Sequence, residues 1–397
     1  MVTNNEQNKL NVPHLRFPEF HGEWEKHGLS EYLDFKNGLN PDSKRFGKGI
    51  KFISVMDILN NPVITYDCIR ASVQATDAEI SSFSVENGDI LFQRSSETLE
   101  DVGRANVYID DRVALFGGFV IRGKKKANYN PLFFRYLLSS PYARKRIIPM
   151  GAGAQHFNIG QEGLSKVLLN FPSIEEQTKI ASLLHLLDER IATQSKLIEK
   201  LESLIKGIVD CTILRKEKNA IVGDVCSISE QIRAEANIDD IITVRLHGNG
   251  VCKSSAENLQ LGATQYYRRR AGQLIYGKQN FHNGAIGIVP ISLDNGITSK
   301  DIPSFDIDEM KCNSVYLLAQ LQSPQYYKPA EALTTGTGSK RLKEETFLKL
   351  PIVLPNKREQ DNIAVLIHRA SMNLDHAKRL LELLSVQKQF LLRQMFI

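Results

Sequence analysis

The 397-residue chain has only five cysteines, at positions 68, 211, 226, 252 and 312, and no two of them form a CxxC pair. This number and spacing exclude a disulfide framework and predict reduced thiols in a cytosolic protein. No run of about 18 apolar residues occurs, so the sequence predicts no membrane-spanning helix. Residues 1–17 are polar and lack the apolar core that a signal peptide needs.

The sequence also lacks the motifs of several enzyme classes. Its nine histidines include no HExxH and no Cys/His cluster with zinc spacing, and there is no GxSxG elbow of a hydrolase. Adenine methyltransferases carry an Asn/Asp-Pro-Pro-Tyr/Phe tetrad, and no Pro-Pro pair is found here. Residues 118–125 and 272–279 come close to a phosphate loop, but both lack the Ser or Thr that would hold Mg²⁺, and their apolar interiors predict strands. We therefore predict no catalytic residue and no metal ligand.

The composition is that of an ordinary globular protein, with 42% hydrophobic and 24% charged residues. At about 100–200 residues per domain, the length predicts two or three domains. The 50 basic residues exceed the 45 acidic ones, which gives a net charge of +5. This excess is compatible with a nucleic-acid partner but is only a mild indication of one.

An internal duplication organises the chain. Residues 171–183 (FPSIEEQTKIASL) reappear at 354–366 (LPNKREQDNIAVL), an offset of 183. The same offset relates Asn130 to Asn313 and Ser140-Pro141 to Ser323-Pro324, and an offset of 184 relates Gly88 to Gly272, Phe92 to Tyr276 and Gly103 to Gly287. An ordered series of matches at almost one offset predicts two halves of about 190 residues with the same fold.

Each half reads as a mixed part followed by a long helix, so the predicted fold class is α+β. In the mixed parts we expect strands at 89–92 and 273–276 and helices at 131–139 and 314–322. Each long helix should begin with a capping box, formed by Ser173 and Glu176 in the first copy and by Asn356 and Glu359 in the second.

A 4-3 spacing of apolar residues runs along both long helices and predicts that they wind around each other as coiled-coil-like partners. The positions that should pair the helices and dock a partner are Ile180, Leu184, Leu187, Ile191, Leu201, Ile363, Ile367, Leu374, Leu381 and Leu384. We expect Ala370 and Ala377 to face Leu187 and Gln194, and Gln194 and Lys388 to fix the register. The alternative is that each helix packs only on its own domain.

Basic and hydrogen-bonding residues gather in the mixed parts, often beside aromatic ones. The candidates for DNA contact are Lys44, Arg45, Lys48, Arg94, Ser95, Arg104, Arg268, Arg270, Lys278, Gln279, Asn280, Lys340 and Arg341. Lys and Arg neutralise phosphates, whereas Arg, Gln and Asn can read base edges in the major groove. Arg94 and Lys278 each follow a matched strand, which favours a shared role. Solvated charged faces are the alternative.

The chain resembles the specificity subunit of type I restriction–modification enzymes over essentially its whole length. The resemblance rests on PHLRFPEF at 13–20 leading to Trp24, GDILF at 88–92, GAGAQ at 151–155, and two Glu-Gln-x-x-Ile-Ala motifs at 176–181 and 359–364. A second copy of the loop, GTGSK at 336–340, follows the family pattern with a one-residue shift. The doubled Glu-Gln motif is the most specific of these features.

The resemblance implies two target-recognition domains in a pseudo-twofold tandem arrangement, at 1–172 and 217–354. They are separated by helical spacer regions at 173–216 and 355–397, which pair antiparallel. Each recognition domain would read one half of an asymmetric bipartite site in double-stranded DNA. The helices would set the spacer and dock two methyltransferase subunits, and two restriction/translocase subunits would complete the complex in the bacterial cytoplasm.

The resemblance further implies that this chain is not catalytic and binds no cofactor, while S-adenosylmethionine, ATP and Mg are used by the partner subunits. An enzyme with its own recognition domains would need several hundred more residues. A coiled-coil scaffold that binds proteins without reading DNA stays open as an alternative.

Overall fold

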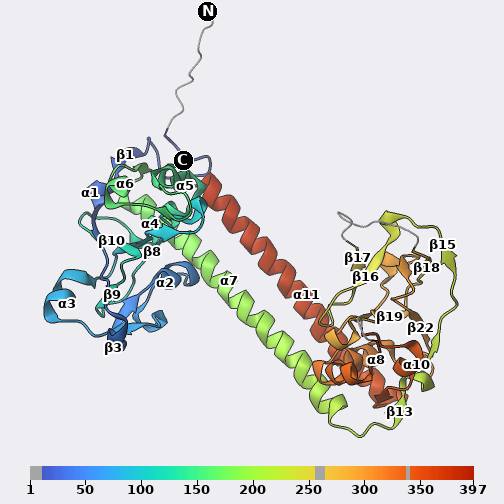
Figure 1. The fold of residues 1–397 in the computed structure, drawn as a ribbon. Coiled ribbons are helices and arrows are strands. Elements are labelled where there is room, and N and C mark those ends of the chain that lie inside the picture. Colours follow the sequence, from blue (N-terminus) through green and yellow to red (C-terminus); the bar gives the residue numbers. More distant parts are fainter. Residues whose placement is uncertain (1–10, 255–263, 337–339) are drawn as a thin grey trace, which may run out of the picture. The chain divides into compact units, whose positions relative to one another are not determined.

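The computed structural model describes residues 11–254, 264–336 and 340–397 (Figure 1). The chain divides into two compact units. Unit 1 comprises the residues up to Gln194 together with Leu380–Ile397, and unit 2 comprises Ser195–Arg379. Among the described residues, no helix combines the length and the apolar character that crossing a bilayer requires.

Unit 1 contains two four-stranded sheets. The first has the order β2-β10-β6-β8 and is antiparallel throughout, and the second has the order β4-β3-β9-β5 with β3 and β9 parallel. The strands are β1 (Glu25–Gly28), β2 (Leu33–Asn37), β3 (Phe46–Ile53), β4 (Ser72–Val73), β5 (Ser84–Val85), β6 (Ile90–Gln93), β7 (Ser95–Ser96), β8 (Ala105–Val107), β9 (Ala114–Phe116), β10 (Val120–Lys125), β11 (Phe157–Asn158) and β12 (Leu168–Phe171). The short helices are α1 (Leu29–Tyr32), α2 (Val55–Asn60), α3 (Asp77–Phe83), α4 (Pro131–Ser139), α5 (Pro141–Ile147) and α6 (Gln161–Ser165). Strand β1 pairs with β12, and β7 pairs with β11.

Unit 2 is built around one four-stranded antiparallel sheet of order β14-β22-β19-β20. A three-stranded sheet β15-β18-β21 and the pairs β16–β17 and β13–β23 complete its strands. The strands are β13 (Ala220–Ile221), β14 (Cys226–Ile228), β15 (Arg233–Ala234), β16 (Ile242–Val244), β17 (Val251–Lys253), β18 (Tyr266–Arg268), β19 (Leu274–Tyr276), β20 (Ile286–Ile288), β21 (Ile297–Ser299), β22 (Ser304–Ile307) and β23 (Pro351–Ile352). The short helices are α8 (Ser314–Leu321), α9 (Pro324–Tyr327) and α10 (Glu344–Leu348).

The duplication seen in the sequence is present in the structure. The sheet β2-β10-β6-β8 of unit 1 has the same strand order as β14-β22-β19-β20 of unit 2, because β6 corresponds to β19 and β10 to β22 at the offset of 184. A backbone bridge joins Ala152 to Asn158 in one copy and Thr335 to Arg341 in the other, again at 183. Residues 337–339 of the second loop lie outside the described residues.

The expected strands and short helices form within one residue of their predicted bounds. Strands β6 and β19 and helices α4 and α8 occupy the positions that the repeat predicted. The two stretches that came close to phosphate loops contain β10 and β19, so they are strands, as their apolar interiors indicated.

Two long helices run through the chain: α7 (Ile174–Val209), which continues into a π-turn at Asp210–Leu214, and α11 (Lys357–Gln394). Each has residues in both units. Within unit 1, Leu187 and Leu384 belong to one hydrophobic core, and Lys388 forms an ion pair with Asp188. Within unit 2, Glu202 pairs with Lys378 and Lys216 pairs with Glu359. As residue numbers rise along α7 and its continuation, the numbers of their ion-pair partners in α11 fall. The helices therefore pair antiparallel in the chain, and the alternative of separate packing is excluded.

The predicted face of each helix is the inward one. Buried side chains occupy the 4-3 positions 180, 184, 187, 363, 367, 370, 377, 384 and 391, and the remaining seam positions are half-buried. Ala370 and Ala377 belong to unit 2, whereas Leu187 and Gln194 belong to unit 1, so their expected facing stays a prediction. Lys388 does hold the register, through Asp188, as expected.

Only one of the two hydrogen bonds of each predicted capping box forms. The backbone N–H of Glu176 donates to Ser173 Oγ (3.4 Å) and that of Glu359 to Asn356 Oδ1 (3.0 Å). The two glutamate side chains are engaged elsewhere. The carboxylate of Glu176 accepts from Arg16 (2.8 Å) and from the indole of Trp24 (3.3 Å), and that of Glu359 pairs with Lys216. Tertiary contacts thus replace the reciprocal bond that the local sequence predicts.

Candidate nucleic-acid interface

The first group of candidate residues surrounds the start of β3. Lys44 and Lys48 are exposed, two residues on either side of Phe46. Arg45 is not free: its guanidinium forms a two-pronged pair with the carboxylate of Glu79, and that pair lowers the pKa of Glu79 to about 2. Arg45 therefore anchors η1 (Ser43–Arg45) to α3, and the two lysines are the charges offered to solvent.

Arg94 and Ser95 lie beside the turn between β9 and β10. The backbone N–H of Arg94 donates to the carbonyl of Phe119 (2.9 Å), and its guanidinium donates to the carbonyl of Gly118 (3.2 Å). Ser95 follows directly and donates through its hydroxyl to Asn158. Arg94 thus fixes the conformation of the turn that carries Phe119.

Close packing against residues 38–40 explains the two glycines of this turn. The N–H of Leu39 donates to the carbonyl of Phe116 (2.9 Å), which holds the segment against the turn. A Cβ added to Gly118 would lie 1.8 Å from Oδ1 of Asn40, and one added to Gly117 would lie 2.9 Å from the ring of Phe52. Only glycine allows this approach.

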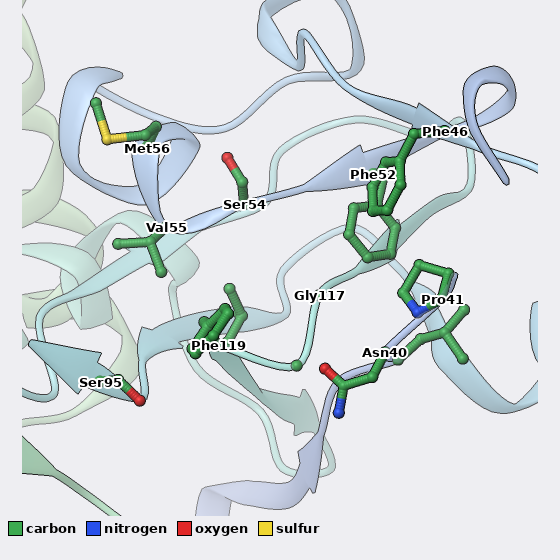
Figure 2. Close-up of a pocket in the computed structure, with 13 residues that line it drawn as sticks. Asn40, Pro41, Phe46, Phe52, Ser54, Val55, Met56, Ser95, Gly117 and Phe119 are labelled. Carbon is green, nitrogen blue, oxygen red and sulfur yellow. The ribbon is translucent and has the colours of Figure 1, made fainter. Parts of the chain in front are cut away.

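Around this turn lies a mostly apolar hollow of about 420 Å³ (Figure 2). Three of its side chains are well exposed: Phe119 at 69%, Met56 at 60% and Phe46 at 44%. Asn40 and Ser95 contribute polar groups to its lining. None of these apolar side chains was among the sequence candidates. The signal was a Gly-Gly-Phe between two apolar runs, which we read only as strand.

Arg104 lies apart from this hollow. It forms an ion pair with Asp101 (2.6 Å) and lines a second, polar hollow of about 390 Å³ together with Arg135 and Arg144. Burial, and to a lesser extent the charge of Arg104, lowers the pKa of Arg144 to about 10.

In unit 2, Arg268 and Arg270 come together, as predicted. Both are exposed and line a hollow of about 440 Å³ that also contains the carboxylates of Asp306 and Glu309. Arg269, between them, has the opposite role. It is fully buried and donates to Thr298 Oγ1 (2.7 Å), Ser304 Oγ (2.9 Å) and a backbone carbonyl, so it is a structural residue.

The other unit 2 candidates are largely paired. Lys278 is 11% exposed and forms an ion pair with Glu344 (2.6 Å). Lys340 pairs with Glu331 (3.4 Å) and Arg341 with Asp301 (3.2 Å). Lys278 and Arg341 line one open hollow, and Gln279 and Asn280 are exposed beside it. Among the described residues no group of three or more His, Cys, Asp or Glu side chains could hold a metal ion.

Comparison with known proteins identifies the domain. Residues 21–203 match the family model described as the type I restriction modification DNA specificity domain. This part of the chain is similar to a type I DNA specificity domain, in agreement with the resemblance seen in the sequence.

Two kinds of relatives accompany the specificity domain. A protein of Methanocaldococcus jannaschii, named "Putative type I restriction enzyme MjaX specificity subunit", is 25% identical over 192 residues, which are 47% of this chain and 44% of that protein. The match therefore spans less than half of the relative. A crystal structure of a type I restriction–modification system S subunit from M. genitalium has a TM-score of 0.64 at 13% identity, covering 97% of this chain and 99% of that one.

A third likeness comes from a structure titled for complex assembly and conformational transition of the type I R-M system. Its TM-score is 0.50 at 12% identity, and it covers 93% of this chain and 96% of that chain. At such low identity the two structural likenesses show the fold, which is the α+β architecture with long helices that the sequence predicted.

Proposed function

We propose that this chain is the DNA sequence-specificity subunit of a type I restriction–modification complex. The observation that carries the proposal is the family match over residues 21–203, in a chain whose two units repeat the same four-stranded sheet. Each unit would then read one half of a bipartite site in double-stranded DNA. The units differ in their surface residues, so the two half-sites should differ and the whole site should be asymmetric.

The recognition domains of the proposal are residues 1–172 and 217–354, with helical spacers at 173–216 and 355–397. Phosphate and base contacts would come from the thirteen polar candidates. The exposed cations Lys44, Lys48, Arg268 and Arg270 are the best supported of these. Arg45 and Lys278 are held by carboxylates, and their part in the proposal is to shape the surface rather than to bind phosphate directly.

The long helices would dock two methyltransferase subunits. Among the described residues, both helices carry large apolar side chains that are exposed to solvent. These are Leu183, Leu186, Leu197, Leu204, Val365, Leu366, Met372, Leu383, Val386 and Phe390. Leu186 and Leu383 are 64% and 65% exposed. Apolar side chains at this density on a helix favour a protein partner over solvent.

In this proposal the chain itself performs no chemistry. S-adenosylmethionine would serve adenine methylation in the methyltransferase subunits, and ATP and Mg would serve two restriction/translocase subunits. The complex would work in the bacterial cytoplasm, on the nucleoid. What supports this division is the family of residues 21–203.

A methylation map tests the proposal. The chain is co-expressed with the methyltransferase encoded beside it in a host without adenine methylation, and modified adenines are located across the genome. We expect one asymmetric two-part motif with a constant gap. The matched variant Arg268→Glu should lose or alter methylation while still co-purifying with the methyltransferase. Co-purification without any methylation by the wild-type pair would favour a protein-binding scaffold instead.

A further inference from the structure

The apolar hollow of unit 1 is lined in part by Ser95, one of the candidate residues for DNA contact. Phe119, Met56 and Phe46 leave 69%, 60% and 44% of their side chains exposed around a space of about 420 Å³. Lys44 and Lys48 flank Phe46 in the chain, and the guanidinium of Arg94 bonds the turn that carries Phe119. Figure 2 shows the apolar side chains of Phe46, Met56 and Phe119 around the hollow.

The hollow is a fixed feature of the fold. Phe52, on its floor, is 6% exposed and packs edge-on against Phe46 with ring centroids 5.4 Å apart. Bonds from Arg94 to the carbonyls of Gly118 and Phe119 and from Gly38 to that of Val120 (3.1 Å) hold the turn. The turn backbone and Phe52 are therefore held before binding, so only the exposed side chains of the hollow need to be ordered by a bound group.

On duplex DNA, few groups fit such a surface. Phosphates and sugars are polar and are met by cations, whereas the C5-methyl group of thymine is the apolar group that projects into the major groove. A side chain that wedges between base steps from the minor groove needs a convex apolar tip. Here the apolar groups line a hollow, which receives a projecting group instead.

We propose that this hollow recognises the C5-methyl group of a thymine in the half-site read by unit 1, with Phe119 as a specificity-determining residue. This inference rests on the proposed DNA-reading function. Lys44 and Lys48 would hold the adjoining phosphates, and Asn40, exposed at the edge of the hollow, lies where it could bond a neighbouring base. Arg94 acts as a positioning residue through the turn.

The test replaces each thymine of the mapped site, one at a time, with deoxyuridine, which removes only the methyl group. Affinities of the complex assembled with its methyltransferase subunits are measured for every duplex. We expect one thymine, in one half-site only, whose replacement weakens binding roughly fourfold, the value of one buried methyl-sized group. Phe119→Ala should weaken binding of the thymine duplex by a similar factor and leave binding of the deoxyuridine duplex unchanged.

Two further variants sharpen the result. Phe119→Leu keeps an apolar side chain and should retain part of the preference for thymine. Ile291→Ala removes an apolar side chain of unit 2 that is 88% exposed and should leave the preference intact. Specific binding with every deoxyuridine duplex bound as well as its thymine parent would overturn the inference but not the proposed function. So would an equal loss for both duplexes in Phe119→Ala. If the wild-type complex shows no site-specific binding at all, the proposed function fails, and this inference with it.

Discussion

A glutamine repeated at the offset of 183 ties each long helix to the domain beside it. Gln177 is 3% exposed, accepts the backbone N–H of Asn130 (3.1 Å) and donates to the carbonyl of Pro172 (3.0 Å). Gln360 is 1% exposed and does the same for Asn313 (2.9 Å) and Pro355 (2.8 Å), with a further bond to the carbonyl of Lys311 (3.1 Å). Asn130 and Asn313 in turn cap α4 and α8. We predict that replacing either glutamine loosens the unit that contains it.

The size of the effect follows from the bonds. Methionine has nearly the shape of glutamine but makes none of these hydrogen bonds, so Gln177→Met strands the half-buried N–H of Asn130 and the buried carbonyl of Pro172. A fully buried stranded group costs about 1–3 kcal/mol and a half-buried one costs less, which gives a loss of about 2–4 kcal/mol for unit 1. Gln360→Met strands one more carbonyl and should cost about 1 kcal/mol more in unit 2. Both losses are below the about 5–15 kcal/mol that stabilises a typical domain, so both variants should fold.

Hydrogen–deuterium exchange measures the loss of stability separately for each unit. A global unfolding curve does not separate the units in a chain that has two of them. In Gln177→Met, amides of α4 and of the first turn of α7 should exchange roughly 30-fold faster or more, since each 1.4 kcal/mol is a factor of ten. The equivalent amides of α8 and α11 should respond in Gln360→Met. Gln389→Met, at an exposed position of α11, is the control and should change little. Unchanged exchange in both glutamine variants, or a change confined to the wrong unit, would refute the reasoning.

Three further predictions concern the helix seam, the charges and the thiols. Leu384 is 4% exposed in the core of unit 1, so Leu384→Asp buries a carboxylate there and should lower the free energy of unfolding by more than about 3 kcal/mol in thermal unfolding. Leu383 is 65% exposed, and Leu383→Asp should change it by no more than about 0.5 kcal/mol. Equal losses in the two variants would contradict the predicted helix seam. Arg268→Glu should reduce DNA affinity without changing the unfolding temperature. Lys278→Glu should lower the unfolding temperature, because the new carboxylate faces that of Glu344. The opposite pattern would make Arg268 the structural residue and Lys278 the DNA contact. Burial raises the pKa of both Cys226 and Cys312 to about 12. At about pH 8.5, iodoacetamide should therefore label the exposed Cys211 and spare these two thiols. Equal labelling of all three would show that the two buried thiols are accessible.

Periodicity and repetition predicted the framework because both are local properties of the chain. The 4-3 spacing along α7 and α11 depends only on the helical period, and the buried side chains fall on it. The offsets of 183 and 184 located matching strands and helices because segments of similar sequence adopt similar structures in similar surroundings. Even so, the spacing gives the face of a helix and not its register, so the expected facing of Ala370 with Leu187 stays a prediction.

Pairing across the fold is what the sequence could not show. Lys278 follows a matched strand just as Arg94 does, and nothing nearby in the chain indicates that Glu344, 66 residues away, neutralises it. Arg45 and Glu79 are 34 residues apart. Glu176 was expected to close a local capping box, but Arg16 and Trp24 reach it from the start of the chain. A count of charges therefore overstates how many cations are available to DNA.

The two units share a framework and differ at one informative place. The carbonyl of Arg94 accepts the N–H of Ile159 (2.9 Å), and the carbonyl of Lys278 accepts that of Leu342 (2.8 Å), so the backbone after β6 and after β19 is held in the same way. The side chains that this backbone presents are not alike. The offset of 184 places Pro303, which is buried, where unit 1 has the exposed Phe119. A hollow for a thymine methyl group would therefore belong to unit 1, and unit 2 would instead present Arg268 and Arg270 beside carboxylates. One backbone plan with different surface chemistry is what an asymmetric bipartite site requires.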